Sequence, residues 1–222
     1  MKYAALSQRI NYRFTQPQLL QRALTHRSYS AAHNERLEFL GDSLLNCTVA
    51  KYLYDSYPDI AEGDLSRLRS NLVNQKTLAT LAQQLQLGDH LLMGEGEVKG
   101  EGNRRPSILA DALEALFGAV WLDADFSTAQ KVVLGLYIPY LGGLDLRTLG
   151  KDPKTLLQEQ LQGNKFPLPK YEVIAIKGEA HAQTFVVSCT IPKLSISTQG
   201  EGGSRRLAEQ IAAAAAYQQI TS

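Results

Sequence analysis

The stretch "HNERLEFLGDSLLN", residues 33–46, places three carboxylates within a leucine-rich segment. Its leucines recur three and four residues apart, which predicts an amphipathic helix. In a helix, Glu35, Glu38 and Asp42 share one face because they are three, four and seven residues apart, whereas the leucines occupy other faces. Gly41 would cost a helix roughly 1 kcal/mol relative to alanine, which indicates that something packs close to it. A solvated acidic stripe on the protein surface is the alternative interpretation.

A second segment repeats this pattern. "SILADALEALFGAV", residues 107–120, places Asp111 and Glu114 one turn apart among apolar side chains, with Gly118 one turn further on. Four acids in partly buried surroundings cannot all ionise unaided, because like charges repel and desolvation raises their pKa values. A divalent cation removes that conflict, and ligands that are all oxygen favour Mg²⁺ or Mn²⁺ over zinc. Carboxylates with Mg²⁺ serve phosphodiester hydrolysis, so the residues predict a Mg²⁺ site and favour phosphoryl chemistry.

The composition restricts the class of protein. A chain of 222 residues with 44% hydrophobic content is expected to form one or two domains. The net charge of +1 means that any binding of nucleic acid must rest on local geometry and not on bulk charge. Apolar runs are too short to span a membrane, and the N-terminus lacks a signal-peptide core. Cys47 and Cys189 are predicted to be buried free thiols of a reducing compartment. We expect a soluble cytoplasmic protein with no membrane partner.

Hydrophobic periodicity divides the chain into two halves. Up to about residue 145 the apolar positions have helical spacing, interrupted by the glycine-rich stretch 93–106, which we expect to be a mobile loop. The pattern then changes to a helix, three strands, a glycine loop at 199–203 and an alanine-rich helix. We therefore predict an all-α domain at residues 1–145, a linker at 146–151 and an α+β domain at 152–222. The order α-β-β-β-α favours both helices on one face of an antiparallel sheet.

Local signals support the elements of the second half. Asp152 followed by Pro153 predicts the start of its first helix, and Gly163 suits the end of that helix. In the middle strand, strict alternation of four apolar residues predicts one buried face. These residues are Phe185, Val187, Cys189 and Ile191.

The motifs resemble those of one known family. "NERLEFLGDSLL" (34–45) resembles the signature of bacterial ribonuclease III, and "ILADALEALFGAVWLD" (108–123) is similar to that family's second acidic helix. "LTHRSY" (24–29) and "EGDLSRLRS" (62–70) also resemble family segments, and the resemblance extends over essentially the whole chain. It implies a Mg²⁺-dependent homodimeric endonuclease, with Mn²⁺ as a possible substitute and no small-molecule cofactor. It also implies that double-stranded RNA, such as rRNA and mRNA precursors, is cut to 5′-phosphate and 3′-hydroxyl ends.

The resemblance assigns roles to individual residues of the helical half. The residues that match the family's metal-binding acids, and hence its catalytic set, are Glu38, Asp42, Asp111 and Glu114. Glu35 matches an acid near the site that is not a direct ligand, and we assign it to the dimer interface. Phe39 matches an aromatic side chain that inserts into the partner subunit. An ordinary core phenylalanine is the alternative.

The second half resembles a double-stranded-RNA-binding domain, a class that reads A-form RNA mainly by shape. Ser204 is a natural N-cap, and the two arginines after it occupy a helical turn that disfavours positive charge, so a bound phosphate would explain them; solvated arginines are the alternative. The resemblance places the helix of 153–163 in a minor groove and makes the loop of 177–183 a second minor-groove contact. Many such domains carry a third basic residue where this chain has Glu209, so we expect a modest grip on phosphate. The residues expected to contact RNA are Gln158, Glu159, Gln162, His181, Ser204, Arg205 and Arg206.

Two other functions compete with the endonuclease. A non-cleaving regulator that binds double-stranded RNA could retain the same scaffold, but it would be expected to lose at least one of the four acids, and none is missing. A metal-dependent phosphohydrolase for small nucleotides would leave the second domain without a purpose. Cleavage of duplex RNA is therefore the preferred hypothesis.

Overall fold

The computed structural model describes residues 3–142, 148–179 and 182–221. The chain divides into two compact units, Met1–Leu149 and Gly150–Ser222, each with its own hydrophobic core. The predicted linker at 146–151 lies partly outside the described residues, so its limits stay a prediction. Among the described residues, no helix combines the length and apolar character that a membrane-spanning segment needs.

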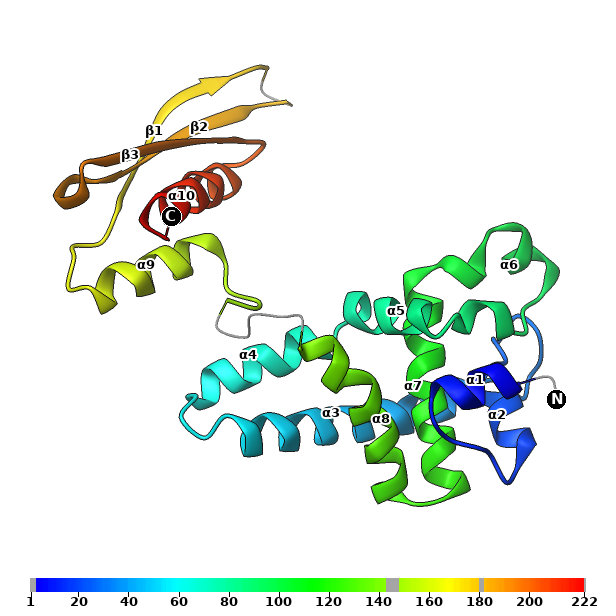
Figure 1. Cartoon of the computed structure of the whole chain (residues 1–222). Helices are drawn as coiled ribbons and strands as arrows, with labels where there is room; N and C mark the ends of the chain where they lie inside the picture. The colour runs from blue at the N-terminus through cyan, green and yellow to red at the C-terminus, as the bar shows by residue number, and fades with distance from the viewer. Residues whose placement is uncertain (1–2, 143–147, 180–181, 222) are drawn as a thin grey trace. The chain divides into compact units, whose positions relative to one another are not determined.

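The first unit is helical throughout, as the periodicity predicts (Figure 1). Its most buried element is α7, in which most residues between Ile108 and Val120 are shielded from solvent. Such a helix is apolar on nearly all sides because other helices surround it. The elements are α1 Ala4–Arg9, α2 Pro17–Ala23, α3 Glu35–Ser56, α4 Glu62–Leu72, α5 Gln75–Gln84, α6 Glu95–Lys99, α7 Pro106–Asp123 and α8 Phe126–Leu141, with 3₁₀ turns η1 Leu87–His90 and η2 Gly102–Arg104.

Helices α3 and α7 cross each other (Figure 1). Each helix has a glycine at the contact. A Cβ atom built on Gly41 would lie 1.7 Å from the carbonyl oxygen of Glu114. A Cβ on Gly118 would lie 2.3 Å from the carbonyl oxygen of Leu37. Both positions therefore exclude any side chain, and the close packing that Gly41 predicts is confirmed.

Two expectations for this unit are wrong. The stretch 93–106, expected to be a mobile loop, instead contains the short helix α6 and the 3₁₀ turn η2. Cys47 is exposed, although the apolar sequence around it predicts burial. The apolar neighbours of Cys47 belong to other faces of α3, and position 47 shares the outward face with Ser43. Cys189 is buried, and both cysteines are free thiols, as predicted.

The second unit confirms the α-β-β-β-α order. Its antiparallel sheet has the strand order β1-β2-β3, with α9 and α10 on the same face (Figure 1). Asp152 caps α9, since its carboxylate accepts from the Thr155 N–H at 3.1 Å. Gly163 is the last residue of that helix. The elements are α9 Pro153–Gly163, β1 Lys170–Lys177, β2 Thr184–Ile191, η3 Pro192–Leu194, β3 Ile196–Gly202 and α10 Arg205–Thr221.

Small residues set the distance between α10 and the sheet. A Cβ on Gly200 would lie 2.2 Å from the carbonyl oxygen of Ala208, so the helix lies directly on β3. The expected glycine loop at 199–203 is therefore wrong, because most of it is the end of β3. On β2, three of the four alternating residues are fully buried as predicted, whereas Phe185 is half-buried. Val186 and Ser188, on the opposite face, are also buried, because β2 is the central strand.

Candidate metal centre and RNA-contact residues

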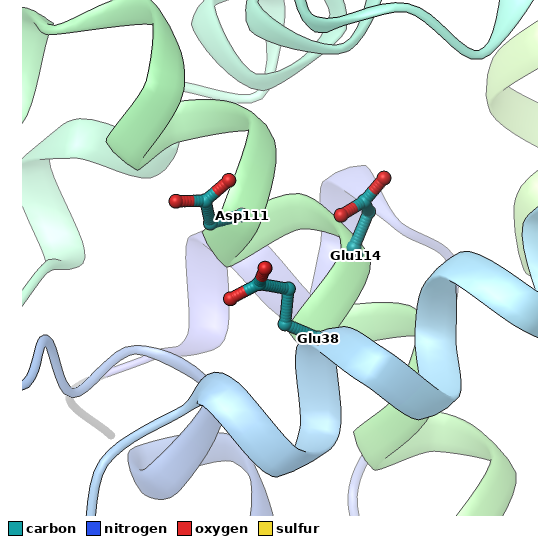
Figure 2. Close-up of side chains that lie close together, drawn as sticks. All are labelled: Glu38, Asp111 and Glu114. Carbon is teal, nitrogen blue, oxygen red and sulfur yellow. The ribbon is translucent and has the colours of Figure 1, made fainter.

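The α3–α7 crossing brings three of the four predicted acids together. Glu38 comes from α3, and Asp111 and Glu114 come from α7 (Figure 2). Each offers a carboxylate oxygen, and these oxygens all lie within 4.8 Å of one another. All three side chains are half-buried. The carboxylates point toward a common space, as a site for a single cation requires (Figure 2).

The two glycines explain how acids on separate helices come so close. The Glu114 carbonyl lies directly over Gly41, which is one turn beyond Glu38 on α3. Gly118, one turn beyond Glu114 on α7, lies against α3 in the same way. Because neither helix carries a side chain at the crossing, the backbones touch and the acids beside them converge.

The charges of this cluster are not paired with cations at ion-pair distance within the described residues. No ion pair among the described residues involves Glu38, Asp111 or Glu114. Burial, followed by repulsion from Asp42, Glu38 and Asp111, raises the pKa of Glu114 to about 8. Burial and then the charge of Asp111 raise the pKa of Glu38, and burial raises that of Asp111 against the opposing charges of His26 and Arg27. The arrangement is destabilised by its own charge and suits a divalent cation.

Asp42, the fourth predicted acid, lies outside this group of three. It is exposed on α3, and its carboxylate accepts from the Asn46 side-chain amide at 2.8 Å. It is nevertheless near enough to be the first charge, after burial, that raises the pKa of Glu114. Asp42 therefore lies at the edge of the site, and Asn46 orients its carboxylate through one of the two oxygens.

The two residues assigned to the dimer interface both lie on α3. Phe39 has 78% of its surface exposed, so it is not an ordinary core phenylalanine in the single chain. Glu35 is exposed, with its carboxylate 3.4 Å from the Arg27 guanidinium and 3.7 Å from the His33 ring. Neither residue belongs to the acid cluster.

A cavity of about 410 Å³ adjoins the acids, and its lining includes residues that sequence reasoning missed. Glu38 and Asp111 form part of its wall. The missed residues come from the family-like segment 24–29, from the stretch 93–106 that was expected to be a loop, and from the first turn of α7. An acid or a basic residue inside the glycine-rich stretch carried no periodic signal. The residues in question are His26, Arg27, Glu97, Arg105 and Ser107.

The predicted RNA contacts on α9 share one exposed face. Gln158, Glu159 and Gln162 are exposed, while Leu157 and Leu161 are buried on the opposite side. The Glu159 carboxylate also accepts from the Lys151 ammonium group. His181 lies outside the described residues.

At the start of α10, Glu209 organises the neighbouring cations. Ser204 caps the helix by accepting from the Leu207 N–H at 3.2 Å, as predicted. Arg205 and Arg206 are both exposed. The buried Glu209 carboxylate accepts from Arg205 at 2.9 Å and from the Lys154 ammonium group of α9 at 2.7 Å. Arg205 is therefore not simply solvated, since it belongs to an ion-pair network that links α9 and α10.

Comparisons with known proteins agree over both units. A family profile described as Ribonuclease-III-like matches residues 16–141, and one described as a double-stranded RNA binding motif matches residues 153–220. The protein called Ribonuclease 3 in Cupriavidus taiwanensis is 60% identical over 99% of this chain and 86% of its own length. The Ribonuclease 3 of Thiobacillus denitrificans is 60% identical over 95% of this chain and 93% of its own length.

Two solved structures resemble the first unit. Both are nuclease domains of ribonuclease III from Campylobacter jejuni. One has a TM-score of 0.61 and 45% identity, and covers 64% of this chain and 97% of that domain. The other has a TM-score of 0.59 and 47% identity, and covers 60% of this chain and 94% of that domain. The second is described as flexible in a region involved in dimer formation.

Proposed function

Since the chain belongs to the ribonuclease III family, we propose that it is an endoribonuclease that hydrolyses phosphodiester bonds of double-stranded RNA. The observation that carries this proposal is the convergence of Glu38, Asp111 and Glu114 at the α3–α7 crossing. The second unit matches a double-stranded RNA binding motif, and we propose that it binds the RNA that is cleaved at this site. The cytoplasm is the proposed compartment of this activity.

The metal of this site is proposed to be Mg²⁺, with Mn²⁺ able to replace it. Oxygen-only ligands suit both ions, and the half-buried carboxylates need a cation to offset their repulsion. Asp42 is proposed as the fourth ligand, because its charge already acts on Glu114. When bound, the cation would supply charge stabilisation to the phosphodiester and would lower the pKa of water.

The proposed reaction is the hydrolysis of one phosphodiester bond, and the residues of the chain position the cation and the RNA for it. Water adds to phosphorus and the 3′-oxygen leaves, so the proposed products carry 5′-phosphate and 3′-hydroxyl ends. The carboxylates fix the position of the cation, and their convergence depends on the glycine crossing beneath them. The exposed faces of α9 and α10 are proposed to hold the duplex through Gln158, Glu159, Gln162, Ser204, Arg205 and Arg206, with His181 on the intervening loop.

The active form is proposed to be a homodimer, in which each subunit cuts one strand. Two large aromatic side chains on α3 support this, since Phe39 is 78% exposed and Tyr54 is 72% exposed. Aromatic side chains are enriched at protein–protein interfaces relative to the rest of the surface. Phe39 is proposed to insert into the partner subunit, with Glu35 nearby in the interface.

Replacing Glu114 with glutamine tests the chemistry. The variant Glu114→Gln keeps the size of the side chain and removes a ligand charge, so we expect cleavage of a labelled duplex in Mg²⁺ to fall by more than about 100-fold. Binding of the same duplex in Ca²⁺, an ion expected to support little cleavage, should persist. The matched control is Glu101→Gln, an exposed acid outside the cluster. Near wild-type cleavage by Glu114→Gln would refute the site assignment.

The same assay decides against the alternative functions. A non-cleaving regulator would bind the duplex in Ca²⁺ and leave it intact in Mg²⁺. A phosphohydrolase for small nucleotides would release phosphate from nucleotides and ignore the duplex. Wild-type protein that neither cuts nor binds double-stranded RNA would refute the proposed function as a whole.

A further inference from the structure

The cavity beside the acid cluster has walls of opposite charge. Its acidic lining residues include Glu38 and Asp111, together with Glu35 and Glu97, and its basic lining residues include Arg27 and Arg105. A polyanionic RNA strand that enters this cavity meets carboxylates that repel it and guanidinium groups that attract it. Arginine is well suited to that role, because its planar fork binds phosphate oxygens in pairs.

Arg105 is the better anchored of the two arginines. Its guanidinium lies 3.2 Å from the Glu97 carboxylate, and the Glu97 side chain is only 27% exposed. The Glu97 oxygen in this pair, Oε2, is shielded from solvent and has no hydrogen-bond partner. Arg27, by contrast, is 72% exposed and contacts the half-exposed Glu35 at 3.4 Å.

The chain around Glu97 is shaped to hold it. Gly102 lies against Glu97, because a Cβ at that position would come 2.9 Å from Glu97 Oε2 and 3.0 Å from the Glu97 carbonyl oxygen. The 3₁₀ turn η2 therefore closes directly onto the acid, and Arg105 follows it at the start of α7. The contact between Arg105 and Glu97 is an ion pair without a hydrogen bond, and a guanidinium has five N–H donors with which to bind a ligand.

We propose that Arg105 binds a phosphate of the RNA strand beside the metal-binding acids, and that Glu97 is the positioning residue that holds its guanidinium there. This inference rests on the proposed function and adds a substrate contact to the same site. Arg105 is the N-cap residue of α7, six residues before Asp111, so the phosphate contact directly precedes the helix that carries a metal ligand. The register of the strand against the acids would then be set by the protein and not by the metal alone.

The test compares two neighbouring arginines. Arg104 is 76% exposed, pairs with the exposed Glu101 at 3.6 Å and does not line the cavity, so Arg104→Gln is the matched control. For Arg105→Gln we expect kcat/KM on duplex RNA to fall by roughly 10–100-fold, the size of one charge-assisted hydrogen bond. Most of the loss should be in KM, because a phosphate is bound equally in the substrate and in the transition state.

The salt dependence of binding separates a phosphate contact from a structural role. In Ca²⁺, the slope of log K against log salt should fall by roughly 1 for Arg105→Gln and stay unchanged for Arg104→Gln. Compared with Arg105→Gln, Arg105→Lys should restore the salt slope but only part of the affinity for duplex RNA. Lysine keeps the positive charge but lacks the planar guanidinium that can bind two phosphate oxygens. Glu97→Gln should keep the slope and raise KM, since the cation remains but is no longer fixed.

Two results would overturn this inference. One is Arg105→Gln matching Arg104→Gln in KM and in salt slope. The other is a loss of melting temperature in Arg105→Gln and Arg105→Lys with an unchanged slope, which would assign Arg105 a structural role. Because the slope is measured by binding, absence of cleavage in the wild type would count against the proposed function and not against the Arg105 contact.

Discussion

At neutral pH the Glu114 carboxyl of the metal-free protein holds a proton, because burial and three neighbouring acids raise its pKa to about 8. The spacing of acids in the sequence predicts that they converge, and the structure brings Glu38, Asp111 and Glu114 together. The sequence does not indicate which of the acids has the highest pKa, because that depends on how deeply each carboxyl group is buried. Glu114 is set deepest against the crossing, whereas Asp42 stays exposed at the edge.

The raised pKa of Glu114 makes stability depend on pH in a defined direction. Between the ordinary value of 4.5 and about 8, the folded protein binds a proton that the unfolded chain has released. The free energy of unfolding of the metal-free protein should therefore decrease as pH rises through this window. Solvent screening reduces this effect on stability, because part of the Glu114 side chain is exposed.

Glu114→Gln should remove most of this dependence. In chelator-treated protein, melting temperature measured from pH 5 to pH 8.5 should fall more in the wild type than in the variant. The difference should be roughly 2–4 °C, which corresponds to about 1 kcal/mol in a chain of this size. Saturating Mg²⁺ should restore the wild type at high pH. Parallel curves for the two proteins would contradict the assigned pKa.

Elements with one buried face are predictable from sequence, and elements without such a face are not. Helices α3 and α7 follow from their apolar spacing, and Gly41 even predicts their close packing. The short helix α6 buries none of its residues, so it leaves no periodic signal in the glycine-rich stretch. Glycines 200 and 202 look like a loop but belong to β3, where the approach of α10 excludes side chains.

The crossing of α3 and α7 gives a prediction about the packing of these two helices. Gly41→Ala would place a methyl group 1.7 Å from the Glu114 carbonyl oxygen, so the helices must separate. Overpacking of this kind costs typically 1–3 kcal/mol, and cleavage should fall because Glu114 moves. Gly135→Ala, on α8 with nothing within 4 Å, is the control and should stabilise by about 0.5–1 kcal/mol. Chemical denaturation measures both changes, and equal stability of the two variants would refute the crossing.

The start of α10 gives a second prediction at this scale. If Arg205 and Arg206 bind phosphates, replacing both with alanine should weaken binding of all duplex sequences about equally, since phosphates carry no sequence information. The salt slope should fall by roughly 1 per lost contact. Arg205→Ala also loses its pair with Glu209, whose carboxylate keeps its second partner, Lys154. A filter-binding titration over a range of salt measures this, and unchanged affinity would mean that neither arginine contacts a phosphate.

At the scale of the whole molecule, the acid cluster and the predicted RNA-binding residues of α9 and α10 belong to two units with separate hydrophobic cores. The first core is built from the helical unit, and the second joins Leu157 and Leu161 of α9 to β2 and α10. Residues 151–222 carry 8 Lys and Arg against 6 Asp and Glu, a net charge of +2. Because this charge is small, one RNA-binding unit is expected to bind duplex RNA weakly. In the proposed dimer, the RNA-binding units of the two subunits would bind the same duplex together, because binding by one raises the effective concentration of the other.

Truncation after Leu149 tests this division. The fragment keeps the whole first core and the hydrogen bond from the Arg67 guanidinium to the Leu149 carbonyl, so it should fold and melt cooperatively. We expect it to cut duplex RNA in Mg²⁺ at low salt and to lose activity steeply as salt rises, because its remaining contacts are few and electrostatic. The same truncation of Glu114→Gln should be inactive at every salt concentration, which ties residual cutting to the acid cluster. An unfolded fragment would mean that the two cores depend on each other, and full activity at physiological salt would mean that the first unit alone provides the grip.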